Sequence, residues 1–290
     1  MTIPPSVSTP PTLPDDGVAA AIAEYQAGEI GAAELAERVL VAQAAAAQVS
    51  ADQRVRIDVD RQRRCGWPEV IYAAGKAADD LHRAVDRSLD ARLAVGEGSA
   101  EVFITRISVE QAAYLGSRYS NAAWDASART MRVRGDEGEI LSPERLAERQ
   151  TPRVNVIAAG TADTPVAAET RQTLAWMGLA SRGIFDVGVA GLYRLLGHLP
   201  SLRSAQCNIV IAGMEGALAS VVGGLVATPV IAVPTSIGYG ANLQGVAALL
   251  TMLNGCTANV CVVNIDAGFK AGFLAASMLR AGERAESSGG

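Results

Sequence analysis

Residues 216–265 form an uninterrupted run without Asp, Glu, Lys or Arg, in a chain of 290 residues where these four types make up 19%. Glu215 and Asp266 flank this run, which contains two strand-like apolar segments, PVIAVP and VCVVNI. Near-continuous apolar strands are typical of parallel sheets covered on both faces, and helices that are apolar on all sides must also be covered outside, usually by other subunits. The run therefore predicts the core of an oligomeric α/β protein, with acidic residues at its ends and a thiol, Cys256, within it.

Length and charge narrow the class of protein. A chain of 290 residues is long enough for about two domains. Its hydrophobic fraction of 49% comes from Ala, Val and Leu rather than from aromatic residues, which make up 4%. The net charge of -5 provides no basic field for a nucleic acid or an anionic membrane surface. We therefore expect a globular protein that binds small molecules, with no nucleic-acid or membrane partner.

The cysteines and the N-terminus predict a cytoplasmic protein. No two of the four cysteines form a Cys-x-x-Cys pair, and the N-terminal segment lacks the basic and apolar regions of a secretory signal. The apolar stretch 216–233 has the length of a membrane span, but Gly223, Gly224 and Pro229 break it into a short helix and a strand. Secretion, a disulfide framework and membrane insertion are therefore not expected.

The pattern along the chain predicts a tail, a helical segment, a small α/β domain, a larger α/β domain and a second tail, at residues 1–16, 17–50, 51–150, 151–283 and 284–290. The first tail is rich in Pro, Ser and Thr and has too little apolar content to pack, so we expect disorder there. The helical segment is rich in Ala, Glu and Leu and is split by Gly28 and Gly31.

In the smaller domain, alternating apolar residues predict strands at VRIDVD, EVIYA and EVFITR, with a helix over residues 76–90 between the last two. Ser108 and Gln111 have the spacing of a capping box and are expected to open the next helix. SARTMRVR predicts a further strand. SPERLAERQTP is interpreted as a charged connection to the second domain.

From Arg153 onward, the chain repeats the order strand, glycine-containing loop and helix. The strand-like segments are VNVIAAG, FDVGVAG, NIVIAGM, PVIAVPTS and VCVVNID. Five consecutive βα units predict one doubly wound parallel sheet, with ligands bound where the carboxyl ends of the strands meet the loops. The loops in which to look for chemistry are GTADTP, AGMEG, PTSIGYGAN and NIDAGFKAG.

Two common kinds of site are hard to build from this chain. His82 and His198 are its only histidines, and both fall in amphipathic helical stretches where a surface position is expected. A Ser-His-Asp hydrolase or a multi-histidine metal site is therefore disfavoured. GYGANL begins like a dinucleotide fingerprint but lacks the third Gly, and no acidic residue follows about 20 positions later at a strand end.

Residues in the loops admit structural and functional interpretations. Asp163 and Thr164 precede Pro165 and are expected to cap a helix, whose N-terminus would also suit a carboxylate or phosphate. Glu215 at a strand end must be hydrogen bonded, paired or used for proton transfer, and capping of the next helix is an equal alternative. A Cys in an apolar region most often packs, so the pattern alone gives Cys256 no chemical role.

Six segments occur in order: IDVDRQRRCGWPEVIYAAGK, GTADTPVAAE, DVGVAGLYRLL, GMEGALASVVGGL, VPTSIGYGANLQGVAALLTMLNGC and VVNIDAGFKAG. Together they lie within residues 54–276 and resemble the LarB family, the pyridinium-3,5-biscarboxylic acid mononucleotide synthases. The C-terminal domain of that family is related to the PurE carboxylase and mutase fold. The resemblance implies a PurE-like doubly wound parallel sheet with a smaller N-terminal α/β domain.

The resemblance also implies a reaction. The family carboxylates the pyridinium ring of nicotinic acid adenine dinucleotide and cleaves its phosphoanhydride with release of AMP, the first step of nickel-pincer nucleotide synthesis for lactate racemase. Carbon dioxide and the dinucleotide are then the substrates. No tightly bound cofactor is expected; Mg²⁺ is a candidate to assist the cleavage, with no metal ligands identified. PurE relatives form octamers, so a homo-oligomer, an octamer, is expected.

In the family a cysteine adds to the ring and a carboxylate removes the ring proton, and the matching residues are Cys256 and Glu215. Thiolate addition turns the electron-poor ring into an enamine whose carbon 5 attacks carbon dioxide, and a thiolate also leaves readily. Cys256 follows Asn254-Gly255, an expected helix C-terminus, whose partial negative charge disfavours a thiolate. We therefore hypothesise that the pyridinium cation of the substrate activates the thiol.

Other residues lie on the loops that would bind the dinucleotide. The candidates are Lys76, Arg106, Thr161, Asp163, Ser236, Gly238, Tyr239, Gly240, Asn242, Asn264 and Asp266. Lys76 and Arg106 are candidates for its phosphates, with solvated surface charge as an equal alternative. The chain departs from the family pattern at Ala74, Ala77, Ala162 and Tyr193.

Two other functions stay open. A PurE-type ribonucleotide carboxylase or mutase would share the fold and the carbon dioxide chemistry, but it would not depend on a thiol and carries a histidine motif that is absent here. A non-catalytic nucleotide-binding regulator would bind the ligand without turnover.

Overall fold

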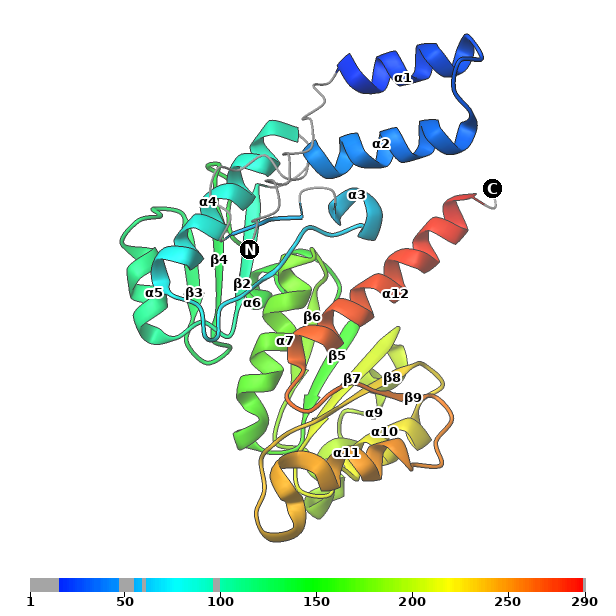
Figure 1. Ribbon diagram of the computed structural model, residues 1–290. Coiled ribbons are helices and arrows are strands. Elements are labelled where there is room, and N and C mark those ends of the chain that lie inside the picture. Colours follow the sequence, from blue (N-terminus) through cyan, green and yellow to red (C-terminus); the bar gives the residue numbers. More distant parts are fainter. Residues whose placement is uncertain (1–15, 47–54, 59–60, 96–99, 289–290) are drawn as a thin grey trace, which may run out of the picture.

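The computed structural model describes residues 16–46, 55–58, 61–95 and 100–288, which form a helical hairpin and two sheets (Figure 1). The hairpin consists of α1 (Asp16–Gln26) and α2 (Ala32–Ala46). Gly28, with a φ of 75°, lies between the two helices, so the predicted split of the helical segment is confirmed. The tail expected at residues 1–16 lies, apart from its last residue, outside the described ranges.

The first sheet has four strands in the order β1-β2-β4-β3. They are β1 (Ile71–Tyr72), β2 (Glu101–Thr105), β4 (Thr130–Arg134) and β3 (Ala122–Asp125). β1 is parallel to β2, and the other pairs are antiparallel. α4 (Ala78–Val95) covers one face, where Leu81 and Val85 pack in one buried cluster with Val102 and Ile104. α5 (Val109–Gly116) begins with the predicted capping box of Ser108 and Gln111.

Three features of this domain differ from the predictions. Residues 55–58 of VRIDVD are not a strand, because side chains satisfy their backbone: Val55 accepts from Arg87, and the Asp58 amide donates to Glu69. β3 was not predicted. SPERLAERQTP, which was predicted to be a connection, contains α6 (Pro143–Arg149). Ser142 caps this helix by accepting a hydrogen bond from the Arg145 amide. The many charged residues of the segment had favoured a connection over a helix. The remaining helix is α3 (Arg61–Cys65).

The second sheet has five parallel strands in the order β6-β5-β7-β8-β9, which confirms the predicted doubly wound sheet. The strands are β5 (Val154–Ala158), β6 (Ser181–Ile184), β7 (Cys207–Ala212), β8 (Val230–Pro234) and β9 (Val260–Val262). The connecting helices are α7 (Thr164–Trp176), α8 (Leu192–Leu196), α9 (Leu199–Ser204), α10 (Leu218–Leu225), α11 (Val246–Leu253) and α12 (Gly268–Ser288). Short 3₁₀ turns are η1 (Thr161–Asp163), η2 (Val189–Gly191) and η3 (Gly240–Gly245).

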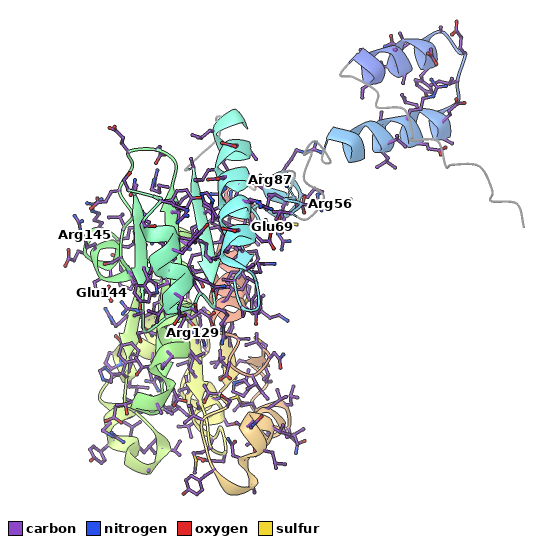
Figure 2. All side chains as sticks on the ribbon, turned by 60° about the vertical axis from the view of Figure 1, so that its left-hand side comes forward. Arg56, Glu69, Arg87, Arg129, Glu144 and Arg145 are labelled. Atoms are coloured by element: carbon purple, nitrogen blue, oxygen red, sulfur yellow. The ribbon has the colours of Figure 1, made fainter. Side chains whose placement is uncertain are left out.

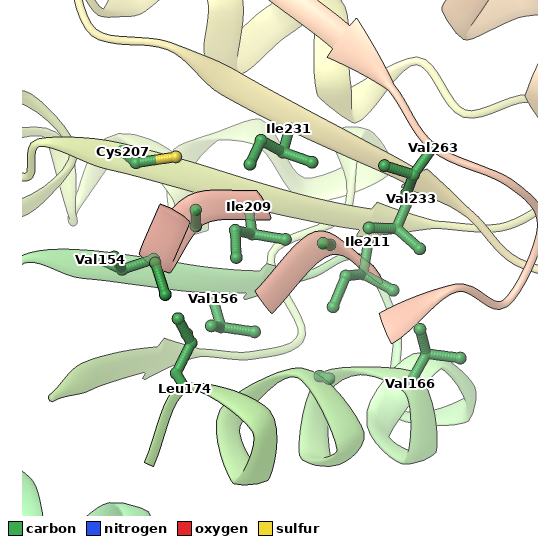
Figure 3. Packing of buried hydrophobic residues seen from close by; sticks show 14 of the residues in the cluster. Val154, Val156, Val166, Leu174, Cys207, Ile209, Ile211, Ile231, Val233 and Val263 are labelled. Atoms are coloured by element: carbon green, nitrogen blue, oxygen red, sulfur yellow. The ribbon is translucent and has the colours of Figure 1, made fainter. Parts of the chain in front are cut away.

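Helices cover both faces of this sheet. On one face, Val166 and Leu174 of α7 and Ala271 of α12 pack against apolar residues of the strands (Figure 3). On the other, Leu218 of α10 and Met252 of α11 pack in a second cluster with strand residues of that face. Alternate residues of each strand therefore enter different cores, as expected for a sheet covered on both sides.

Two boundaries in this domain differ from the predictions. FDVGVAG is a loop rather than a strand, since β6 ends at Ile184, whose register partner is Ile157. The buried Val187 of this loop instead packs over the sheet beyond β5. α12 continues to Ser288, through the segment expected to be a tail.

None of the helices within the described ranges is long and apolar enough to span a bilayer.

The two domains share an aromatic contact. Phe103 points away from the core of α4 and stacks on Trp176 of α7, with ring centroids 5.3 Å apart. Its ring also lies 6.2 Å from that of Phe269 in α12. β2 is consequently buried on both faces, one against its own helix and the other against the second domain.

Candidate active site

Acidic and hydroxyl groups from separate loops meet at the carboxyl edge of the five-stranded sheet. Asp163, in η1 after β5, is buried. Its Oδ1 accepts a hydrogen bond from Thr235 Oγ1 at 2.7 Å, and its Oδ2 accepts from the Gly160 amide at 3.0 Å. Burial raises the pKa of Asp163, the hydrogen bond from Thr235 opposes this shift, and the nearby charge of Asp266 adds to it. The edge therefore holds two neighbouring carboxyl groups.

Asp266 joins the end of β9 to the loop after β8. Its Oδ1 accepts from the Ser236 amide at 2.9 Å, and its own amide donates to the Pro234 carbonyl at 2.9 Å. Asp266 has a φ of 56°, in the left-handed region that Asp tolerates better than most residues. The structure thus brings together Asp163, Ser236 and Asp266, three of the predicted ligand-binding residues.

The loop at residues 235–245 is held by its own side chains. Nδ2 of Asn242 donates to the Ile237 carbonyl at 3.2 Å, and Gly238 and Gly240 have positive φ angles of 153° and 59°. Asn242 is buried, and its Oδ1 has no donor in the described part of the chain. Tyr239, in contrast, is 81% exposed. Asn242 therefore shapes the loop, while Tyr239 is available to a ligand.

Glu215 lies at the same edge, in the turn between β7 and α10. The turn is held by the Met214 amide, which donates to the Ile237 carbonyl at 2.9 Å. Glu215 is exposed and has no hydrogen-bonding or ionic partner among the described residues. No side chain caps α10, whose N-cap residue is Ala217. Glu215 therefore does not cap α10, and the capping alternative is wrong.

Cys256 is exposed in the segment between α11 and β9. The amides of Asn254 and Gly255 donate to carbonyls of the last turn of α11, so the thiol does follow a helix C-terminus. A segment that precedes a parallel strand lies toward the amino edge of the sheet, whereas Glu215 lies at the carboxyl edge.

The packing of α10 on α11 shows how far apart the two predicted catalytic groups are. A Cβ placed on Gly216 would lie 3.0 Å from the Ala248 carbonyl oxygen, and one on Gly255 would lie 2.9 Å from Ser220 Oγ. The two helices therefore run side by side, and Cys256 lies about two helical turns, on the order of 10 Å, from the level of Glu215. Within one chain the thiol and the carboxylate are not in contact.

Lys76 and Arg106 are in different surroundings. Lys76 is exposed and lines a groove of about 420 Å³ in the smaller domain, together with Arg56 and Glu69, which lie beside α4 (Figure 2). Arg106 lies at the boundary between the domains, where its guanidinium donates to both carboxylate oxygens of Glu169. The two cations proposed for the substrate phosphates therefore do not share one pocket.

The other predicted positions are at the surface. Thr161 and Asn264 are exposed, and Asn264 Oδ1 accepts from the amide of Ile265 at 2.9 Å. Of the departures from the family pattern, Ala162 is exposed and Tyr193 is 78% exposed in α8. Across the described ranges, no group of three or more His, Cys, Asp and Glu side chains is arranged to hold a metal ion.

Two residues at this edge were not predicted. Thr235 directly follows the buried strand β8, where its hydroxyl is well placed to bond a loop carboxylate, and it donates to Asp163. Glu169 is a buried carboxylate in a helix of mostly small residues; a lone acid on the inner face of such a helix is a signal that a cationic partner must be near.

Comparisons with known proteins agree with this architecture. Residues 37–135 match the LarB/PurE-like N-terminal domain, and residues 153–287 match AIR carboxylase. An uncharacterized protein of Methanocaldococcus jannaschii is 36% identical over 226 residues, which cover 77% of this chain and 83% of that protein. The two domain matches point to an enzyme that carboxylates a nucleotide. The chain belongs to the LarB family, with a PurE-like C-terminal domain.

Proposed function

We propose that the protein carboxylates carbon 5 of the pyridinium ring of nicotinic acid adenine dinucleotide and hydrolyses the phosphoanhydride, forming pyridinium-3,5-biscarboxylic acid mononucleotide and AMP. The observation that carries the proposal is a pair of exposed groups in a chain of the LarB family: the carboxylate of Glu215, which precedes α10 and has no structural partner among the described residues, and the thiol of Cys256, which follows α11. Neither group is used by the fold, so both are free for chemistry.

The proposed steps use the thiol and the carboxylate in turn. Because the two groups are not in contact within one chain, we propose that they meet on one ring where two subunits pack together. The Cys256 thiolate forms a bond to a ring carbon, and the ring nitrogen takes up the electron pair, which makes carbon 5 electron-rich. Carbon 5 then forms a bond to carbon dioxide. Glu215 removes the proton from carbon 5, and the carbon–sulfur bond breaks so that the ring regains its aromaticity and positive charge. Water cleaves the phosphoanhydride in a separate hydrolysis.

The carboxyl-edge loops are proposed to hold the dinucleotide. Thr161, Ser236 and Tyr239 are exposed around Asp163 and Asp266, and α7 begins immediately after η1. The N-terminus of a helix favours a phosphate through its free amides and dipole. A phosphate at the start of α7 would place the attached ribose beside the loop after β8.

A PurE-type ribonucleotide carboxylase is a second candidate, since residues 153–287 match AIR carboxylase. The two functions differ in their need for a thiol. An enzyme that acts on an aminoimidazole ring, which is already electron-rich, does not require covalent addition to make the ring carbon nucleophilic.

The function is tested by incubating the purified protein with nicotinic acid adenine dinucleotide and ¹³C-bicarbonate. We expect mass spectrometry to detect AMP and a mononucleotide whose mass has increased by one labelled carboxyl group. An aminoimidazole ribonucleotide incubated in parallel tests the second candidate. Binding of the dinucleotide without either product would instead support a non-catalytic regulator and contradict the proposal.

A homo-oligomer is proposed from the apolar surface of η3 and α11. Leu243, Leu250 and Leu253 are 67%, 59% and 61% exposed, in a part of the chain without charged side chains. Exposed apolar patches of this kind are typical of subunit interfaces. A second copy placed here would also cover the outer side of α10 and α11, where Glu215 and Cys256 face solvent.

We expect light scattering at micromolar concentration to give the mass of an oligomer, with an octamer as the specific prediction. Leu250→Glu should shift the mass toward smaller species, because it places a charge in the proposed interface. Leu40→Glu is the control, since Leu40 is 64% exposed but lies on α2. A wild-type protein that is monomeric under these conditions contradicts the proposal.

A further inference from the structure

Arg106 extends from the smaller domain to the carboxyl edge of the second sheet. It follows β2 directly and has a φ of 58°, in the left-handed region that a long side chain rarely adopts. Its Nε lies 3.0 Å from Glu169 Oε1 and its Nη2 lies 3.1 Å from Glu169 Oε2. Nη2 also donates to the backbone carbonyl of Asp266. One guanidinium thus contacts both α7 and the segment after β9.

Glu169 holds Arg106 in this position through a buried ion pair. The Glu169 side chain is 3% exposed and also accepts a hydrogen bond from Thr105 Oγ1. All of these donors come from the smaller domain. Because an ionised carboxylate that is buried without partners costs several kcal/mol, the pair holds the end of β2 against α7.

Asp266 connects Arg106 to the loop after β8 through hydrogen bonds to both. Its carbonyl receives Arg106, its Oδ1 receives the Ser236 amide at 2.9 Å, and its own amide donates to the Pro234 carbonyl. Thr235, the residue before Ser236, donates to the buried carboxyl group of Asp163 at 2.7 Å, so neighbouring residues of this loop bond both carboxyl groups. The charge of Asp266 contributes to the raised pKa of Asp163. Arg106 is therefore two hydrogen bonds away from the backbone of Ser236.

We propose that Arg106 is a positioning residue through which the smaller domain fixes the ligand-binding loop at residues 235–245. Its guanidinium is occupied by Glu169 and Asp266 and acts on the loop through Asp266, rather than on the phosphates of a substrate. The proposal deepens the proposed function, on which only its kinetic consequence rests; its effect on the loop does not depend on which reaction the enzyme performs.

Hydrogen exchange measured by mass spectrometry on the full-length protein tests the proposal without an activity assay. Arg106→Lys keeps a positive charge beside Glu169 but loses the planar fork that reaches Glu169 and Asp266 together. We expect exchange in peptides covering residues 235–245 to become about tenfold faster or more, with β7 peptides unchanged. Faster exchange in both would instead indicate general destabilisation and overturn the proposal.

Gln172→Ala provides a matched control. Gln172 Nε2 donates to Asp125 Oδ2 at 2.8 Å, so this variant also removes a hydrogen bond between the domains, but one that does not involve Asp266. Exchange in the loop should be unchanged. An equal acceleration by Gln172→Ala and Arg106→Lys would show that any loosening of the domain boundary suffices, and the specific role of Arg106 would be refuted.

A double-mutant cycle tests whether Arg106 acts through Asp266. Asp266→Gly removes the acceptor of the Ser236 amide while tolerating the positive φ. If the route is correct, adding Arg106→Lys to Asp266→Gly should accelerate loop exchange no further; additive effects would contradict it.

The kinetic consequence separates positioning from phosphate binding. With the dinucleotide as substrate, Arg106→Lys should lower kcat more than it raises KM, since a displaced loop disturbs alignment in the transition state. A raised KM with unchanged kcat and unchanged loop exchange would assign Arg106 to the phosphates instead. If the wild type does not turn over the dinucleotide, the proposed function fails, while the exchange experiment still decides the role of Arg106.

Discussion

Cys256→Ser is expected to reduce carboxylation of nicotinic acid adenine dinucleotide by about a thousandfold or more, because loss of a covalent nucleophile removes the step on which the others depend. A serine hydroxyl is almost entirely protonated at neutral pH and leaves carbon far less readily than a thiolate. The measurement is the initial rate of labelled mononucleotide formation, together with the intact mass of the protein, which should show an adduct only when Cys256 is present.

Cys261→Ser is the control for this variant. Cys261 is an exposed residue on the edge strand β9, and its Sγ lies 3.5 Å from the carbonyl oxygen of Val230 in the neighbouring strand β8. Partial burial of its sulfur against β8 raises the pKa of Cys261, so it is a poor source of thiolate. Its replacement should leave the rate within about twofold. A Cys256→Ser enzyme that keeps normal activity would rule out covalent catalysis by this residue.

Activation of Cys256 by its substrate is tested in the same series. The thiol follows the C-terminus of α11, whose partial negative charge opposes a thiolate. Alkylation of Cys256 should therefore be slow in the ligand-free protein and faster when a pyridinium ligand that cannot react is bound. Equally rapid alkylation with and without this ligand contradicts substrate activation.

Glu215→Gln is expected to lower the carboxylation rate by roughly 10²–10⁴-fold, the usual contribution of a general base. The amide preserves the shape of the side chain but cannot accept the proton from carbon 5. Because Cys256 remains, its thiolate should still add to the ring, and the covalent adduct should accumulate instead of turning over. Rapid-quench intact-mass spectrometry measures the adduct, and product formation measures the rate.

Glu148→Gln serves as the control for Glu215→Gln, since Glu148 is an exposed glutamate on α6, the helix that precedes β5, and belongs to none of the carboxyl-edge loops. Its rate should match that of the wild type. If Glu215→Gln retains full activity, another group removes the ring proton; if it loses activity without accumulating adduct, Glu215 acts before or during addition of the thiol.

The large sheet could be predicted because nearly all residues of its central strands are apolar, on both faces. β7 and β8 are buried at every position, and such apolar runs can be predicted as strands without knowing which strands they pair with. β3 (Ala122–Asp125) could not be predicted, since its residues are half-buried or exposed and have no apolar face. It exists because β4 supplies hydrogen-bonding partners, which are specified elsewhere in the chain.

The candidate site divides in a similar way. Asp163, Ser236 and Asp266 each follow a parallel strand, so topology alone places them at one edge. The pairing of Arg106 with Glu169 could not be predicted, because it joins two domains: a lone acid in α7 indicates that a cation is near, but not which residue supplies it. The separation of Glu215 from Cys256 also depends on packing, since it follows from α10 running beside α11.

The aromatic contact of Phe103 with Trp176 and Phe269 limits how this enzyme can be dissected. A truncation that begins at Arg153 would strip the ring of Phe103 from two large aromatic side chains and leave Glu169 without its three donors from the smaller domain. We therefore expect the PurE-like half to be less stable on its own than within the whole chain. Gene fusions and shortened versions of this protein are accordingly expected to require both halves.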